Sequence, residues 1–230
     1  MAVVLPMESS PEVMNEYLSK LGVSENWRMV DVLGLDKDTL STLPKPVLAL
    51  ILLFPLSEAY EKHRTEEEVQ LRQKDKQPPK EIFHLKQVLS NVCGTVALVH
   101  SVANNTNHIK LQEGVLKSYI DDAKDLDAAG RGALLEKFTG ILDAAREAAG
   151  NAGGKATEAN EAPNNHFVTF IHKNGTLFEL DGRKTLPVDH GSTSDSTFLE
   201  DAAKICQRFI DREPDNLGFN VVALVAANAE

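Results

Sequence analysis

The stretch HFVTFIHKNGTLFELDGRK, residues 166–184, contains the strongest turn signal in the chain. Two runs rich in β-branched and aromatic residues flank an Asn-Gly dipeptide, which is typical of a two-residue hairpin turn. A turn of this length places His166 opposite Arg183 and puts Asp181 one diagonal step from His166, on the same face. A one-residue slip in register would separate the two side chains. The hairpin therefore predicts a histidine base, His166, with its own orienting carboxylate, Asp181.

A second stretch, QVLSNVCGTVALVH at residues 87–100, places a cysteine where polar sequence gives way to an apolar helical run. With Asn91 as N-cap, Cys93 is the second residue of a helix that ends near Asn104. The positive end of the helix dipole favours a thiolate at this point, and Gly94 leaves room for a substrate backbone. From this stretch alone, a small buried core residue is an equally good interpretation of Cys93.

The rest of the chain alternates between helical and extended patterns, and we predict an α/β fold of mixed order. Ser10 as N-cap, Pro11 and Gly22 mark the two ends of a first helix. The segment 144–162 has glycines but no aromatic, Val, Ile or Leu residue, which predicts a long loop without ordered structure. The remaining predicted elements are strands at 27–33, 46–54 (buried on both faces) and 219–226, a solvated helix at 57–73, two or three helices between 111 and 148, and a capped helix at 193–213.

The composition is that of an acidic globular protein. Its net charge of −10 argues against binding to nucleic acid, because no basic stripe would meet the phosphate backbone. Two cysteines, Cys93 and the mid-helix Cys206, form neither a disulfide framework nor a metal motif. We expect no metal or cofactor, no membrane segment, a cytoplasmic location and a monomer. The other histidines are expected to be solvated or structural: His63, His84, His100, His108, His172 and His190.

The cysteine stretch and the hairpin together closely resemble the ubiquitin carboxy-terminal hydrolases, which are papain-like thiol hydrolases. The resemblance extends over LPMESSPEVMNEYLSKLG, NWRMVDVLGLD, PVLALILLFP, YEKHRTEEE, HGSTSDSTFLEDA and DNLGFNVVALVA, and covers nearly the whole chain. It implies the fold of this family's short members: a central, mostly antiparallel β-sheet flanked by helices, with a knotted backbone. It also implies a single catalytic domain over residues 1–230, with a flexible crossover loop at about 144–163 that passes over the active site.

The resemblance also implies a role for each residue of the site. Cys93 matches the nucleophile, His166 the general base and acid, and Asp181 the residue that orients the histidine. Gln87 matches the glutamine whose side-chain amide joins the Cys93 N–H in an oxyanion hole. The order Gln, Cys, His, Asp along the family's sequence is complete here.

The activity implied by the resemblance is hydrolysis of small or flexible groups from the C-terminal glycine of ubiquitin, without a metal or cofactor. Glu8, Glu12 and Asp31 match positions near ubiquitin's Arg-containing tail, whereas Asn216 stands where a close relative has an acid. The acidic chain would complement that tail. Three alternatives stay open: a ubiquitin-holding protein with little turnover, a preference for a related ubiquitin-like modifier, and a papain-like peptidase with another substrate.

Overall fold

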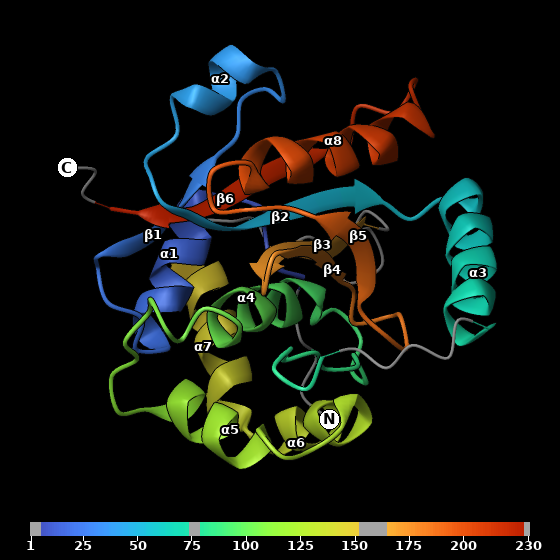
Figure 1. Cartoon of the computed structure of the whole chain (residues 1–230). Helices are drawn as coiled ribbons and strands as arrows, with labels where there is room; N and C mark the ends of the chain where they lie inside the picture. Colours follow the sequence, from blue (N-terminus) through green and yellow to red (C-terminus); the bar gives the residue numbers. More distant parts are fainter. Residues whose placement is uncertain (1–5, 74–78, 152–164, 228–230) are drawn as a thin grey trace.

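A six-stranded sheet forms the centre of the computed structural model, which describes residues 6–73, 79–151 and 165–227 (Figure 1). The order across the sheet is β1-β6-β2-β3-β4-β5, and all neighbours run antiparallel. The predicted α/β chain with a mostly antiparallel sheet is therefore confirmed. The strands are β1 (Trp27–Asp31), β2 (Val47–Pro55), β3 (Asn165–Lys173), β4 (Thr176–Leu180), β5 (Val188–Ser192) and β6 (Asn220–Ala226).

Strand β2 lies inside the sheet and is apolar along its length, as predicted for a strand buried on both faces. Because alternate side chains point to opposite faces, Ala49 and Ile51 enter one core while Leu50 and Leu52 enter the other. Helices α2 and α8 cover one face, and five helices cover the other (Figure 1). The helices of these two layers are α1 (Pro11–Lys20), α2 (Lys37–Ser41), α4 (Cys93–Ala103), α5 (Val115–Ala123), α6 (Ala128–Lys137), α7 (Thr139–Asn151) and α8 (Phe198–Asp211).

Helices α1 and α7 pack against each other. The predicted N-terminal end of α1 is confirmed, whereas the predicted end of α7 was wrong. At the start of α1, the Ser10 hydroxyl accepts a hydrogen bond from the N–H of Val13, as predicted. The loop expected from Ala144 begins later, because α7 continues to Asn151. Its alanines have high helix propensity and are small enough to pack closely, and Ala144, Ala145 and Ala148 are buried. The rest of the expected loop, at 152–164, lies outside the described residues.

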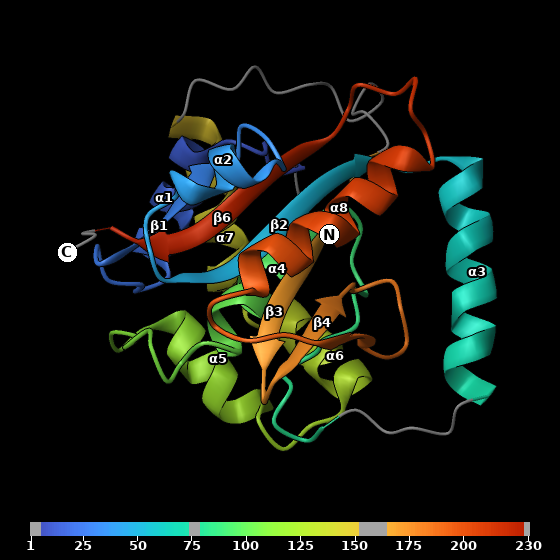
Figure 2. The ribbon, with the colours of Figure 1, turned by 45° about the horizontal axis from the view of Figure 1, so that its top comes forward.

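Helix α3 (Glu58–Gln73) stands at one edge of the molecule, beside the two helical layers (Figure 2). The expectation of a solvated helix was only partly right, because Tyr60 and Glu68 are buried. Charged and polar contacts tie α3 to the segment that follows β4. These contacts are Glu61 with Arg183 at 2.5 Å, Glu67 with Lys184 at 2.5 Å, and Glu68 with the hydroxyl of Thr185 at 2.8 Å.

In the described ranges, no helix combines the length and apolar character needed to cross a membrane. The single-domain organisation and the knotted backbone stay predictions.

Candidate active site

The hairpin forms in the predicted register and brings His166 to Asp181. Lys173 pairs with Thr176, and the ladder continues to Thr169 and Leu180, where β4 ends. Asn174 and Gly175 both have left-handed backbone angles, with φ of +50° and +77°, as a two-residue turn of this kind requires. The expected pairing of His166 with Arg183 lies beyond this ladder, and His166 pairs instead with Phe54 of β2. The His166 Nε2 atom is still 2.6 Å from Asp181 Oδ1.

Cys93 is the first residue of α4, whereas the sequence predicted it to be the second residue of this helix. The predicted N-cap, Asn91, was wrong, because Val92 occupies the cap position and Asn91 has a left-handed φ of +62°. Asn tolerates this conformation, so the chain turns sharply just before the helix. The Cys93 N–H thus belongs to the first turn, whose donors have no acceptor within the helix. The thiol is partly exposed at this end of α4.

Gly94, the residue after this thiol, and the second cysteine, Cys206, both have structural explanations. Gly94 was expected to leave room for a substrate backbone, but Met7 lies over it: a Cβ at residue 94 would be 2.8 Å from the Met7 Cβ. Cys206 is fully buried in α8, as expected for a core residue, and burial raises the pKa of its thiol. Only Cys93 among the two cysteines is therefore accessible to a reagent or substrate.

His166 is almost fully buried, yet its surroundings favour the charged imidazolium. Burial alone would lower the pKa of His166, but the Asp181 carboxylate and the hydrogen-bonded Cys93 side chain raise it to about 9. Burial also opposes the Asp181 carboxylate, but the neighbouring His166 outweighs it and holds the pKa of Asp181 well below its usual range. Because Nε2 is bonded to Asp181, Nδ1 is the ring nitrogen left for Cys93. The arrangement is a thiol, an imidazole and a carboxylate in sequence.

Asp181 is held from several sides. The backbone N–H of Arg183 donates to its Oδ1 at 2.8 Å, and the Tyr60 hydroxyl donates to its Oδ2 at 2.7 Å. His84 Nε2 is 3.0 Å from the backbone carbonyl oxygen of Asp181. The side chain is fully buried, so protein groups replace the water that a carboxylate normally binds.

Gln87 lies on a segment that side chains fix beside the Asp181 loop. Its N–H donates to the Gly182 carbonyl at 2.8 Å, and its Nε2 donates to the Leu89 carbonyl at 2.9 Å. Within the described residues, its buried Oε1 has no hydrogen-bond partner. The N–H of Leu85, two residues earlier, donates to His100 Nε2, and Arg131 of α6 donates to the carbonyl of His84. Helices α4 and α6 thus set the path that leads to Gln87.

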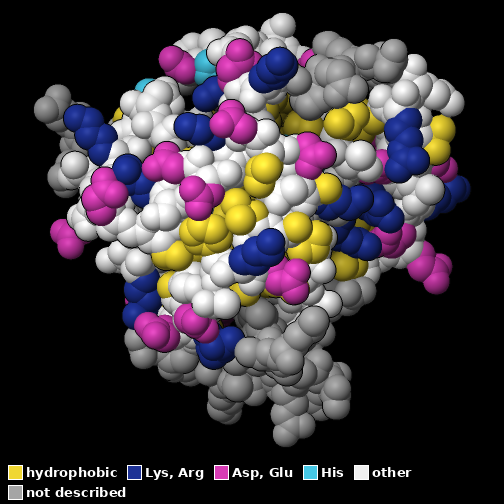
Figure 3. Space-filling view, turned by 90° about the horizontal axis from the view of Figure 1, so that it is seen from below, with side chains coloured by type: hydrophobic (Ala, Val, Ile, Leu, Met, Phe, Trp, Pro, Cys, Tyr) yellow, Lys and Arg dark blue, Asp and Glu magenta, His cyan; other side chains and the backbone are white. Residues whose placement is uncertain are grey.

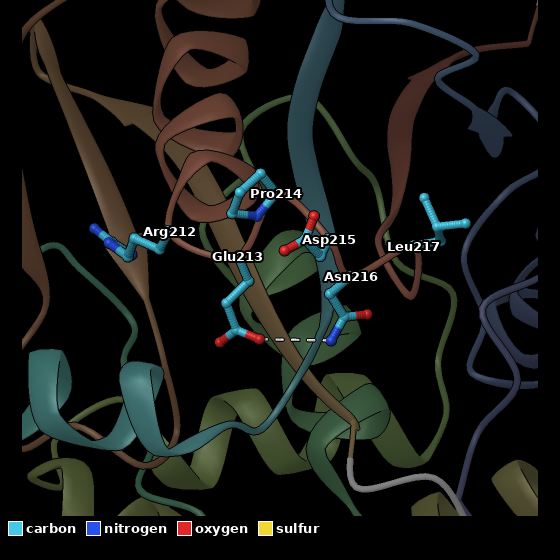
Figure 4. Close-up of a pocket in the computed structure, with 6 residues that line it drawn as sticks. All are labelled: Arg212, Glu213, Pro214, Asp215, Asn216 and Leu217. Atoms are coloured by element: carbon cyan, nitrogen blue, oxygen red, sulfur yellow. Dashed lines mark hydrogen bonds between the residues drawn. The ribbon is translucent and has the colours of Figure 1, made fainter.

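The acidic residues expected near a substrate tail lie at the surface. Glu8 precedes α1, Glu12 is in its first turn and Asp31 ends β1, and all three are exposed. Asn216 lies in a surface hollow lined by residues 212–217, between α8 and β6 (Figure 4). Its Oδ1 accepts a hydrogen bond from the N–H of Gly218 at 2.9 Å, so this side chain shapes its own loop. None of the four residues predicted for catalysis lines this hollow.

In the part of the chain that the structure describes, no group of three or more His, Cys, Asp or Glu side chains could hold a metal ion. Four of the six other histidines make hydrogen bonds to partners of their own. His84 and His100 are buried and bonded to backbone, while His172 and His190 pair with Asp195 and Glu179.

The family model for "Ubiquitin carboxyl-terminal hydrolase, family 1" matches residues 4–211 of the chain. This chain belongs to that family. A ubiquitin carboxyl-terminal hydrolase of Drosophila melanogaster is 47% identical to this family member over 222 residues, which cover 96% of this chain and 97% of the relative. The human ubiquitin carboxyl-terminal hydrolase isozyme L1 is 40% identical over 223 residues, covering 96% and 98% of the two chains.

The fold of this family member is also similar to that of a solved structure, the Trichinella spiralis UCH37 catalytic domain bound to ubiquitin vinyl methyl ester. The TM-score is 0.77 at 23% sequence identity, over 98% of this chain and 96% of that one. The expected papain-like family fold, with its antiparallel sheet between helices, is confirmed by this likeness.

Sequence reasoning missed the groups that surround Asp181 and the Gln87 segment. Tyr60 was included in a helix expected to be solvated, although it is the single tyrosine of a charged stretch, which is a signal for burial. His84 and Arg131 carried no comparable signal, because both act on backbone carbonyl groups that a sequence pattern does not place.

Proposed function

We propose that this chain is a thiol-dependent ubiquitin C-terminal hydrolase that works through Cys93, His166 and Asp181. The observation that carries the proposal is the side-chain series from the Cys93 thiol through the His166 imidazole to the Asp181 carboxylate, at the start of α4. Membership of the hydrolase family supports ubiquitin as the partner. The structure bound to ubiquitin vinyl methyl ester gives the same partner for a protein of similar fold.

The reaction begins with attack of the Cys93 thiolate on the carbonyl carbon of ubiquitin's terminal glycine. The carbonyl oxygen becomes an oxyanion, for which the Cys93 N–H and the side chain of Gln87 are the donors. Gln87 Nε2 carries two N–H donors, and one of them donates to the Leu89 carbonyl at 2.9 Å. The second N–H is therefore the donor for this role.

Protonated His166 then gives its proton to the departing amine or thiol, and the bond from carbon to that group breaks. The product is an acyl-enzyme joining ubiquitin's terminal carbonyl to Cys93. His166, now neutral, removes a proton from water, whose oxygen attacks the acyl carbon and releases ubiquitin. Asp181 keeps the imidazole oriented and stabilises its charged form.

The substrates of this reaction carry small or flexible groups on the last glycine of ubiquitin. The predicted crossover loop at about 144–163 would act as the filter, and α7 fixes the start of that segment as helix. Glu8, Glu12 and Asp31 are exposed and could meet a basic tail.

On the face below α5 and α6, acidic and basic side chains are mixed around an apolar centre (Figure 3), so the chain's net charge forms no uniform patch there. We place the enzyme in the cytoplasm as a monomer.

The experiment that tests the proposal is hydrolysis of ubiquitin carrying a fluorogenic amide at its C terminus. Cys93→Ala should lower turnover by about 10⁴-fold or more and abolish capture by a ubiquitin vinyl methyl ester probe. The matched control is Cys206→Ala, which removes the fully buried thiol of α8 and should change turnover by less than about twofold.

The rival hypotheses give different results in the same assay. A ubiquitin-holding protein would bind ubiquitin tightly while the wild type shows no turnover. A general peptidase would cleave unrelated peptides as fast as the ubiquitin substrate. A ubiquitin-like specificity would appear as faster turnover of a modifier other than ubiquitin. Each of these outcomes would contradict the proposal.

A further inference from the structure

The Asp181 carboxylate is held at both of its oxygen atoms. Oδ1 accepts hydrogen bonds from His166 at 2.6 Å and from the Arg183 N–H at 2.8 Å. Oδ2 accepts one from the Tyr60 hydroxyl at 2.7 Å, and among the described residues no other group donates to it. Because Asp181 is fully buried, bulk water does not reach this oxygen. The rotation of the carboxylate about its Cβ–Cγ bond therefore depends on Tyr60.

Tyr60 is itself fixed in place. Its N–H donates to the Ser57 hydroxyl at 3.0 Å at the start of α3. Its ring packs against Phe54 with a centroid distance of 4.6 Å, and Phe54 also packs edge-on against His166 at 5.7 Å. Burial and the neighbouring Asp181 charge raise the pKa of Tyr60, so its hydroxyl keeps its proton and stays a donor.

We propose that Tyr60 is a positioning residue of the active site, which acts through Asp181 to keep the His166 imidazole aligned with Cys93. The inference rests on the proposed function. Without the hydroxyl, Oδ2 would be a buried charged oxygen lacking a donor, and the carboxylate would turn to find another partner. That rotation takes Oδ1 away from His166 Nε2 and weakens the support of the imidazolium.

The charged and titratable groups around the His166–Asp181 pair come from four parts of the chain. Removing the Tyr60 hydroxyl leaves the formal charge of all of them unchanged, so the substitution tests hydrogen bonding alone. The groups are Tyr60 of α3, Cys93 and His100 of α4, His84 before Gln87, and Arg183, Lys184 and Glu179 around the end of β4.

The first test is the steady-state kinetics of Tyr60→Phe with the fluorogenic ubiquitin substrate. We expect kcat to fall by about tenfold or more with KM changed by less than about twofold, because the lost bond is to a charged group that does not touch substrate. The matched control is Tyr119→Phe, which removes an equally buried hydroxyl that donates to the Arg131 carbonyl at 2.8 Å. This control should lose similar stability and keep its kcat within about twofold.

A double-mutant cycle separates positioning from a structural role. If Tyr60 acts through Asp181, then Tyr60→Phe should lower kcat by less than about twofold further when Asp181 is already Asn. Equal losses in the two backgrounds would overturn the proposal, as would a Tyr60→Phe enzyme with wild-type kcat.

A readout that needs no ubiquitin keeps this proposal separate from the proposed function. An NMR titration of His166 needs no substrate. In Tyr60→Phe, the pKa of His166 should fall from about 9, because a carboxylate turned away from Nε2 supports the imidazolium less. An unchanged or higher pKa of His166 would contradict positioning. If the wild type hydrolyses no ubiquitin substrate, the proposed function fails, and the His166 titration still decides the role of Tyr60.

Discussion

His166 and His100 are both buried, with 2% and 0% of their surfaces exposed, yet the protein drives their pKa values in opposite directions. Burial opposes charge on both imidazoles. At His166 a carboxylate and a thiol outweigh it and raise the pKa to about 9. At His100 burial is reinforced by repulsion from His84, and the pKa falls well below its usual value. Burial disfavours the charged form of both imidazoles, and the neighbouring groups decide whether the charged form is nevertheless the stable one.

The two histidines also perform different tasks with the same ring. His100 Nε2 accepts the N–H of Leu85 at 3.0 Å, so its proton lies on Nδ1. Its ring stacks on that of His84 with a centroid distance of 5.3 Å. A charged His100 would have no lone pair left for Leu85, on the segment that leads to Gln87. A neutral His100 can therefore hold the backbone of Leu85, whereas a charged His166 can donate a proton in the reaction.

The largest effect is expected when the charged neighbour of His166 is replaced by a neutral side chain. Asp181→Asn should lower kcat by about 10³- to 10⁴-fold, and the pKa of His166 should fall because burial is no longer opposed. Kinetics with the fluorogenic ubiquitin substrate and an NMR titration of His166 would measure the two effects. The matched control is Asp195→Asn, which makes the same change in the His172–Asp195 pair, whose carboxylate is 98% exposed. An Asp181→Asn enzyme that keeps a tenth of wild-type kcat would remove the carboxylate from its assigned place.

A smaller effect should be a loss of wild-type folding stability at alkaline pH, caused by deprotonation of His166. The folded-state pKa of His166, about 9, lies above the usual value of about 6.5, so its contribution is complete below pH 6.5 and is lost as pH rises through 9. The loss should reach up to about 3 kcal/mol. Urea unfolding at several pH values would show it as a decline in the wild type that is shallower in His166→Gln. Parallel profiles for the two proteins would contradict the raised pKa.

The smallest effect concerns His100 on the acidic side. Its folded-state pKa is depressed, so its contribution is complete above pH 6.5 and is lost as pH falls below that value. Glutamine at this position can accept the Leu85 N–H and cannot become charged. Between pH 7 and 5.5, the wild type should therefore lose about 1 kcal/mol more stability than His100→Gln. An equal loss in both proteins would show that His100 keeps its usual pKa.

The elements that could be predicted from sequence are those fixed by local chemistry. The Asn-Gly turn set the register of β3 and β4, and the register brought His166 to Asp181. The apolar run of β2 was recognised as a strand buried on both faces. Ser10 capped α1 as expected. In each case a few adjacent residues contain the whole physical reason.

The elements that could not be predicted depend on distant partners. Asn91 has the composition of a helix cap, but the sharp turn before Cys93 uses it in a left-handed conformation. The alanines of α7 are ordered by packing on α1, which their own sequence does not reveal. Tyr60 is buried because Asp181, 121 positions later, accepts its hydroxyl. The site that was predicted is thus completed by contacts that only the folded chain defines.

The place of β6 in the sheet bears on how the protein is made. This strand, formed by residues 220–226, lies between β1 and β2. A ribosome delivers the chain from its N terminus, so both early strands leave the exit tunnel long before the strand that joins them exists. Until then their edges stay unpaired and open to aggregation. The molecule should thus acquire its proteolytic activity only after β6 has left the tunnel, and a nascent chain that still lacks this strand would not be an active protease.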